Sequence, residues 1–204
     1  MKKLLIYAAL PMCMFATLHS CSTNSITHTP VKSDTDDLKE HSTVCYVQLN
    51  DGTIKHYKTL KLVTSPFGTP HLLADRKTKF KASEVTAYQN KDHYAISQRT
   101  FISGRQTHVA TETLPGFAVR IIKGRLNVYC KKYVNGQFAV NEYYLQIGDN
   151  GMIQPYSAEL MSALIKDNTE AYWFFTNTKF KKHLPEKLTT TAKMYNGDQF
   201  VTMN

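Results

Sequence analysis

The sequence predicts an α+β fold, in which a mainly antiparallel β-sheet is followed by short C-terminal helices. Two turn dipeptides, Asp51-Gly52 and Asn135-Gly136, each lie between runs rich in β-branched and aromatic residues, which is the pattern of a β-hairpin. Shorter runs of similar composition lie between the two hairpins, and helical periodicity begins only after residue 156. Short strands joined by short turns fit a meander, a sandwich or an open barrel, and the sequence leaves these three arrangements open.

The first hairpin is expected from residues 43–49 and 53–60, on either side of the turn residues. A type I′ turn at Asp51-Gly52 requires positive φ at both central positions, which Asp and Gly tolerate. With that turn, Leu49 faces Ile54. Because side chains alternate along a strand, the residues expected to share the apolar face are Cys45, Val47 and Leu49.

The second hairpin is expected from residues 126–134 and 137–147, around Asn135-Gly136. Pairing outwards from that turn places Val128 opposite Tyr143. Alternate residues then form a face that is expected to lie in the core: Leu126, Val128, Cys130, Tyr143 and Leu145. The other face is expected to be solvent-facing or partly covered, and it carries Asn127, Tyr129, Lys131 and Tyr133.

Between the hairpins, shorter strands are expected at residues 84–88, 93–97, 107–111 and 117–122. After them, Ser157 is a favourable N-cap for a helix whose apolar stripe is Leu160, Met161, Leu164 and Ile165. A second short helix is expected over residues 171–176. A third begins near Pro185 and ends at Asn196-Gly197, because proline suits the first helical turn and glycine the residue after the last.

The N-terminus has the parts of a bacterial export signal. Lys2 and Lys3 precede an uncharged, mainly apolar stretch over residues 4–18, which is shorter than the roughly 20 residues of a membrane-spanning helix. The next residues, Leu18-His19-Ser20-Cys21, resemble the lipobox of bacterial lipoproteins, with His19 as an unusual occupant. This resemblance implies that residues 1–20 are removed as a signal peptide and that Cys21 is acylated. An ordinary signal peptide with an incidental cysteine is the alternative.

Residues 21–42 are expected to be a flexible tether that starts at the acylated cysteine. They are rich in small polar residues, so they bury too little apolar surface to offset the entropy lost on ordering. An acidic cluster at Asp34, Asp36 and Asp37 lacks the glycine and distal glutamate of a calcium loop. One globular domain is expected over residues 43–204, β-rich over 43–155 and helical over 157–196.

The charge of the mature chain bears on its partners. Removing residues 1–20 leaves 23 Lys and Arg against 16 Asp and Glu, a net charge of +7. The basic residues are scattered, and an exported chain does not meet nucleic acid as a usual partner, so we expect none. Ser22-Thr23-Asn24-Ser25 does not match the acidic export signal of some surface lipoproteins, so we expect a lipid anchor in the outer membrane that faces the periplasm.

Few residues suggest chemistry. Cys45 and Cys130 could form a disulfide in an oxidising envelope, and two buried thiols are the alternative. The histidines show no metal-binding spacing, and a long-range set such as His71, Asp75 and His93 has no local support, so neither metal nor cofactor is expected. Residues 148–151 contain two glycines but no following Lys-Ser/Thr, which predicts a turn and not a phosphate loop. Catalytic residues therefore remain unassigned.

One face of the second hairpin is a candidate binding surface. Aromatic and basic side chains interleave on it, as in surfaces that bind sugars or acidic polymers. The candidate residues are Tyr129, Lys131, Tyr133, Phe138 and Tyr144. In the alternative interpretation, the C-terminal helices cover this face and pack Trp173, Phe174 and Phe175 against it.

Several segments together resemble uncharacterised Bacteroidota envelope lipoproteins. They are the lipobox, the polar tether, residues 49–53 (LNDGT), 124–129 (GRLNVY) and 142–146 (EYYLQ), and Tyr195-Asn196. The resemblance covers most of the mature chain, implies no known activity and carries over no functional residues. We therefore expect a non-enzymatic, lipid-anchored module that binds an envelope protein or glycan. The alternatives are an envelope hydrolase with an active site assembled from distant residues, and a purely structural protein of the outer membrane.

Overall fold

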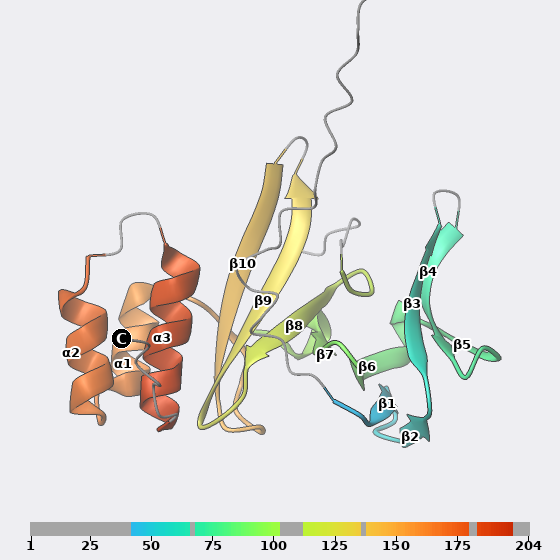
Figure 1. Ribbon diagram of the computed structural model, residues 1–204, viewed down its shortest axis with the longest axis horizontal. Coiled ribbons are helices and arrows are strands. Elements are labelled where there is room, and N and C mark those ends of the chain that lie inside the picture. Colours follow the sequence, from blue (N-terminus) through green and yellow to red (C-terminus); the bar gives the residue numbers. More distant parts are fainter. Residues whose placement is uncertain (1–41, 66–67, 103–111, 136–137, 180–182, 198–204) are drawn as a thin grey trace, which may run out of the picture. The chain divides into compact units, whose positions relative to one another are not determined.

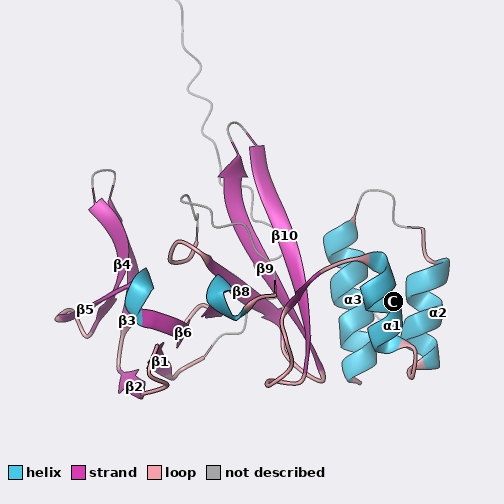
Figure 2. Cartoon of the chain, turned by 180° about the vertical axis from the view of Figure 1, so that it is seen from behind, coloured by secondary structure: helices cyan, strands magenta, loops and turns pink. Residues whose placement is uncertain are grey.

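Two antiparallel sheets precede three helices in the computed structural model, which describes residues 42–65, 68–102, 112–135, 138–179 and 183–197 (Figure 1). These residues all belong to one compact unit. All described strands precede the three α-helices along the chain, which confirms the α+β prediction (Figure 2). The signal segment, Cys21, the tether up to residue 41 and the strand expected at residues 107–111 lie outside the described residues.

The large sheet has eight strands in the order β11-β10-β9-β8-β7-β6-β1-β2. From β6 to β11 each strand pairs with its neighbour in sequence, so this part is a meander, the first of the three arrangements expected. The strands are β1 (Cys45–Leu49), β2 (Ile54–Tyr57), β6 (Val85–Gln89), β7 (Tyr94–Ser97), β8 (Phe117–Ile122), β9 (Leu126–Asn135), β10 (Phe138–Ile147) and β11 (Gln154–Pro155).

A small second sheet, which the sequence did not predict, is inserted between β2 and β6 along the chain. It consists of β3 (Leu60–Ser65), β4 (Gly68–Ala74) and β5 (Thr78–Lys81). The turn between β4 and β5 has positive φ at both Asp75 and Arg76, 46° and 60°, without a glycine. Because glycine is the usual sequence signal for such a turn, this hairpin gave no local cue.

The first hairpin has a different register from the expected one. Gln48, not Leu49, pairs with Ile54. The Gly52 amide donates to the Leu49 carbonyl at 3.0 Å and Gly52 has φ of +84°, which is a type I turn followed by a left-handed residue. The loop is therefore one residue longer than the predicted type I′ turn. The predicted face persists, because Cys45 and Val47 are both fully buried.

The second hairpin is shifted by two residues relative to the prediction. Val128 pairs with Leu145, and Cys130 pairs with Tyr143. Since side chains alternate with a period of two, a two-residue shift changes each partner and leaves both faces intact. The apolar face is buried as expected.

One row of directly paired residues crosses the large sheet on its core face. It runs through Val47, Tyr88, Ala95, Val119, Cys130 and Tyr143. At one end of this row, side chains of the small sheet such as Leu72 complete the core. At the other end the core is completed by helical side chains such as Met161 and Leu188.

The first helix begins, and the third begins and ends, where the sequence predicts, whereas the second starts two residues earlier and ends one residue later than expected. They are α1 (Ala158–Ile165), α2 (Thr169–Asn177) and α3 (Leu184–Asn196), and the 3₁₀ turns η2 (Ala82–Glu84) and η3 (Gln98–Thr100) lie earlier in the chain. Ser157 caps α1, and Gly197, with φ of +79°, ends α3. No helix in the described part of the chain has the length and apolar character needed to cross a bilayer.

The helices pack on the core face of β8 and β9, which contradicts the alternative interpretation that they cover the candidate binding face. They cover the face that carries Val128 and Cys130, not the Tyr129 face. Phe175 is buried in that core, whereas Trp173 is 64% exposed. The reason is chemical: the apolar stripe of each helix is matched by the apolar face of the hairpin.

Candidate functional site

Polar and aromatic residues line the face of the large sheet opposite the helices. Tyr46 pairs with Gln89, and Gln89 pairs with Tyr94. On the neighbouring strands Arg120 pairs with Tyr129. Directly paired residues of antiparallel strands point to the same side, so residues distant in sequence are aligned on one face.

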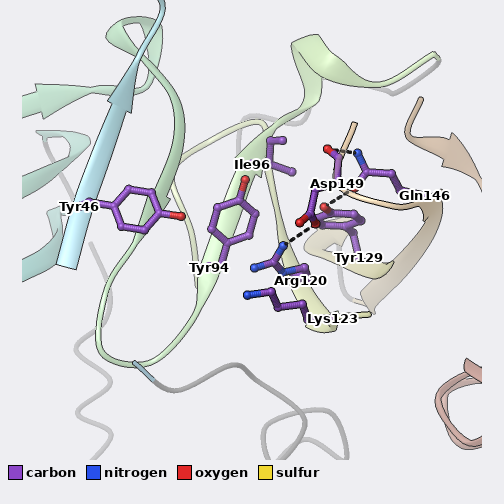
Figure 3. A pocket seen from close by; sticks show the side chains of 8 residues that line it. All are labelled: Tyr46, Tyr94, Ile96, Arg120, Lys123, Tyr129, Gln146 and Asp149. Carbon is purple, nitrogen blue, oxygen red and sulfur yellow. Dashed lines mark hydrogen bonds and ion pairs between the residues drawn. The ribbon is translucent and has the colours of Figure 1, made fainter. Parts of the chain in front are cut away.

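A pocket of about 230 Å³ opens on this polar face. Its walls come from β1, β7, β8, β9, β10 and the turn after β10 (Figure 3). The lining residues are Tyr46, Tyr94, Ile96, Arg120, Lys123, Tyr129, Gln146 and Asp149. Pockets that enclose a whole small molecule usually measure about 300–1,000 Å³, so this one is suited to a single group of a larger ligand.

Arg120 is the central cation of the pocket. Its side chain is only 9% exposed, although it lies within the otherwise apolar strand β8. The guanidinium carbon lies 4.2 Å from the ring centroid of Tyr94, a cation–π arrangement, and Nη1 lies 3.6 Å from Asp149 Oδ1. Because arginine stays protonated and the site is partly desolvated, the pocket holds a fixed positive charge.

The wall that carries Asp149 is held by a hydrogen-bond network. The Tyr129 hydroxyl donates to Gln146 Oε1 at 2.7 Å, and Gln146 Nε2 donates to the Gly151 carbonyl at 2.8 Å. Asn127 Nδ2 donates to Asp149 Oδ1 at 3.2 Å. These bonds attach the turn at residues 148–151, predicted from its glycines, to the sheet and fix the position of the carboxylate.

The pocket is also lined by a second cation, Lys123, and by the phenol groups of Tyr46 and Tyr94. Lys123 follows β8 and is exposed, and Figure 3 shows its terminal nitrogen pointing the same way as those of Arg120. Burial raises the pKa of the Tyr94 hydroxyl above its usual value. This hydroxyl therefore stays protonated at neutral pH and can donate a hydrogen bond to a ligand.

The binding face expected from the sequence is not an exposed platform. Tyr129, Lys131 and Tyr144 are nearly or fully buried, Tyr133 is half-buried, and only Phe138, 73% exposed, projects into solvent. Tyr129 and Tyr144 are covered by a small cluster that also contains Phe101, Ala118 and Ile153. The ring centroids of Phe101 and Tyr144 are 4.5 Å apart. Of the five expected residues, only Tyr129 lines the pocket.

Lys131, Tyr133 and Tyr144 instead surround one carboxylate. Glu142 accepts hydrogen bonds from Lys131 Nζ at 3.1 Å, the Tyr133 hydroxyl at 2.8 Å and the Tyr144 hydroxyl at 3.0 Å. Burial alone would raise the pKa of Glu142, but these hydrogen bonds and the Lys131 charge outweigh it and lower the pKa. The cluster satisfies its own polar groups, which makes it a structural element of the sheet.

The two mature cysteines, for which the sequence left a disulfide and two buried thiols open, are found as free thiols. Cys45 and Cys130 are both buried thiols and are not linked to each other. They lie on β1 and β9, with β6, β7 and β8 between them. Four strand spacings amount to roughly 19 Å, whereas a disulfide requires Cα atoms within about 7 Å.

Metal ligation finds no support in the described part of the chain, where no three His, Cys, Asp or Glu side chains converge. His93, one of the residues considered for such a site, instead contacts the Tyr88 hydroxyl through Nε2 at 3.1 Å. The face of β7 and β8 that forms the pocket was not singled out by the sequence analysis. Its one local signal is Arg120, a charged residue within an apolar strand.

Comparison with protein-family models, curated proteins and solved structures finds no match to this chain. The chemistry of the pocket is therefore the basis on which a function is inferred.

Proposed function

We propose that this chain is a lipid-anchored protein of the bacterial cell envelope whose folded domain binds a ligand in the Arg120 pocket and catalyses no reaction. The proposed lipid anchor rests on residues 18–21, in which a cysteine follows the export signal. Two or three acyl chains on Cys21 would hold the protein to a membrane, since one chain alone binds only marginally. The periplasmic face of the outer membrane is the proposed location.

The observation that carries the binding function is the open pocket beside a buried guanidinium. Arg120 has a side chain that is only 9% exposed, and it lines a cavity of about 230 Å³. General acid–base or nucleophilic catalysis needs positioned groups that give or take protons near neutral pH. The lining consists of cations, phenols, an amide, an isoleucine and one well-exposed carboxylate, which suits binding better than catalysis.

The anchor is tested by labelling with radioactive palmitate in a bacterial host. The wild-type chain is expected to incorporate the label and to fractionate with the outer membrane. Cys21→Ser is expected to lose both properties. A Cys21→Ser chain that matures and localises like the wild type contradicts the proposed anchor.

The binding function is tested by chemical crosslinking in cells followed by purification of the lipoprotein. Tyr46→Ala removes a pocket wall, and Tyr172→Ala is the matched control because Tyr172 lies on α2 and is 41% exposed. We expect an envelope component to be recovered with the wild type and with Tyr172→Ala, and to be depleted with Tyr46→Ala. Equal recovery with both variants, or recovery of lipid alone, contradicts a binding role for the pocket.

A further inference from the structure

We propose that the Arg120 pocket recognises an acidic sugar, meaning a saccharide unit that bears a carboxylate or a phosphate. This inference rests on the proposed binding function and specifies the class of its ligand. Two features of the pocket carry it: a pair of cations beside the space for an oxyanion, and a phenol and a carboxylate positioned for hydroxyl groups.

The anionic part of the ligand is assigned to Arg120 and Lys123. The guanidinium presents a planar set of donors that matches carboxylate and phosphate geometry, and the ammonium adds a second charge at the rim. The 3.6 Å separation between Arg120 Nη1 and Asp149 Oδ1 exceeds the about 2.7–2.9 Å of a close charge-assisted hydrogen bond. Asp149 is also 70% exposed. The ion pair with Asp149 is therefore long and solvent-exposed, and a ligand oxyanion in the pocket would lie beside the same guanidinium.

The sugar part of the ligand is assigned to the groups around these cations. The Asp149 carboxylate repels any oxyanion bound beside it, and a ligand that also carries hydroxyl groups can offset this repulsion by donating hydrogen bonds to the carboxylate. Asp149, which is 70% exposed, offers carboxylate oxygens for sugar hydroxyls, and the Tyr94 hydroxyl can donate. The tyrosine rings at positions 46 and 94 offer apolar surface for the C–H face of a sugar ring (Figure 3).

The size and composition of the pocket favour a sugar over a peptide. An apolar peptide side chain is bound in a mainly apolar pocket, but Ile96 is the single aliphatic residue in this lining. A volume of about 230 Å³ accommodates one ring with its substituents, and the remainder of a glycan would extend into solvent.

The test is calorimetric titration of the full lipidated protein in detergent. The probes are galacturonate and glucose 6-phosphate, with galactose, glucose, acetate and inorganic phosphate as partial ligands that lack either the charge or the ring. We expect both acidic sugars to bind at least tenfold more tightly than any partial ligand. We also expect their affinity to fall as salt is added, because the charges are partly exposed.

Three variants locate the binding in the pocket. Lys123→Gln removes the exposed rim cation and is expected to weaken both acidic sugars severalfold, whereas Lys79→Gln, on the exposed side of β5, is the matched control and leaves them unchanged. Asp149→Asn removes the carboxylate that repels plain anions. The variant is expected to bind inorganic phosphate more tightly and to show a smaller difference in affinity between acidic sugars and phosphate.

Four results would overturn the inference: no saturable binding of either acidic sugar, equal binding of neutral sugars, equal binding of acetate or phosphate, or equal effects of Lys123→Gln and Lys79→Gln. These results are distinguishable from failure of the proposed function. If crosslinking still recovers a component that depends on Tyr46 while both acidic sugars fail to bind, the pocket binds something else and only the sugar assignment is wrong. If both experiments fail, the binding function is wrong as well.

Discussion

Asn196 joins the end of α3 to the start of β9, and its removal gives the sharpest prediction about the fold. Its side chain makes two hydrogen bonds to the backbone of Leu126, 70 residues earlier in the chain: Oδ1 accepts from the amide at 2.8 Å, and Nδ2 donates to the carbonyl at 3.1 Å. Leu126 is fully buried. Asn196→Ala therefore leaves two main-chain groups of the core edge without these partners.

The expected loss of stability follows from that geometry. A hydrogen bond contributes about 0.5–1.5 kcal/mol net, and both bonds are part-buried, so Asn196→Ala should lower the free energy of unfolding by about 1–3 kcal/mol. In a domain of this size each kcal/mol corresponds to about 2–4 °C in Tm. The assay is thermal and urea-induced unfolding of the purified protein, followed by circular dichroism.

Gly124 provides a stringent second arm of this experiment. A Cβ atom at position 124 would overlap the Asn196 amide, whose nitrogen, carbon and oxygen would all lie within 2.9 Å of it. The amide cannot move away without losing both bonds to Leu126, so Gly124→Ala alone should be as destabilising as Asn196→Ala. In the double variant the overlap is absent, so we expect the two effects to be strongly non-additive. Additive effects, or a Gly124→Ala variant as stable as the wild type, would refute this reasoning.

Three further predictions concern the core and the Glu142 cluster. Folding lowers the pKa of Glu142, so its ionised form stabilises the fold above its ordinary pKa of 4.5, and this stabilisation is lost as the pH falls through the lower folded value. The Tm difference between wild type and Glu142→Gln should therefore shrink below about pH 4.5. A pH-independent difference would contradict this. Met161→Ala should lower the free energy of unfolding by about 2–5 kcal/mol because Met161 is fully buried. Trp173→Ala should change the free energy of unfolding by less than about 0.5 kcal/mol because Trp173 is 64% exposed. Equal losses of stability in urea titrations of the two variants would be inconsistent with the observed packing. Alkylation without reductant, read out by mass spectrometry, should modify Cys45 and Cys130 only after the protein is unfolded. If the unfolded protein is alkylated only after reduction, the two cysteines form a disulfide.

Faces of strands were predictable from the sequence, whereas registers were not. Alternation of apolar residues placed Val128 and Cys130 on the core side, and both are buried there. The partner of each residue depends on which residues close the turn, and a longer loop at Gly52 shifted the first hairpin by one position. Turn geometry is set by only a few backbone angles, so composition alone does not determine it.

The pocket could not be assembled from the sequence because it depends on strand order. Tyr46 and Arg120 are brought to one face by pairings that place β1 beside β6 and β7 beside β8. No local pattern states that β1 joins the sheet at β6 and not elsewhere. What the sequence did contain was a charged residue in an apolar strand, and such a residue requires a partner, a ligand or water.

The buried state of Tyr129 and Tyr144 shows a further limit of face prediction. Their face is polar at Lys131, which suggested solvent, yet residues from outside the hairpin cover it. Phe101 and Ile153 lie 52 residues apart in sequence, form an isolated β-bridge, and pack in the same cluster as the two tyrosines. Contacts of that range are decided by the packing of the whole domain and leave no periodic signature.

The most direct test of a ligand-binding pocket in this protein is site-specific photo-crosslinking in living cells. A photoreactive phenylalanine analogue replaces Tyr46 in one strain and Tyr172 in another, so that the same chemistry is presented at the pocket and on the exposed surface of α2. A binding pocket predicts a discrete crosslinked envelope component at position 46 and none at position 172. The same products at both positions, or none at position 46, would contradict it.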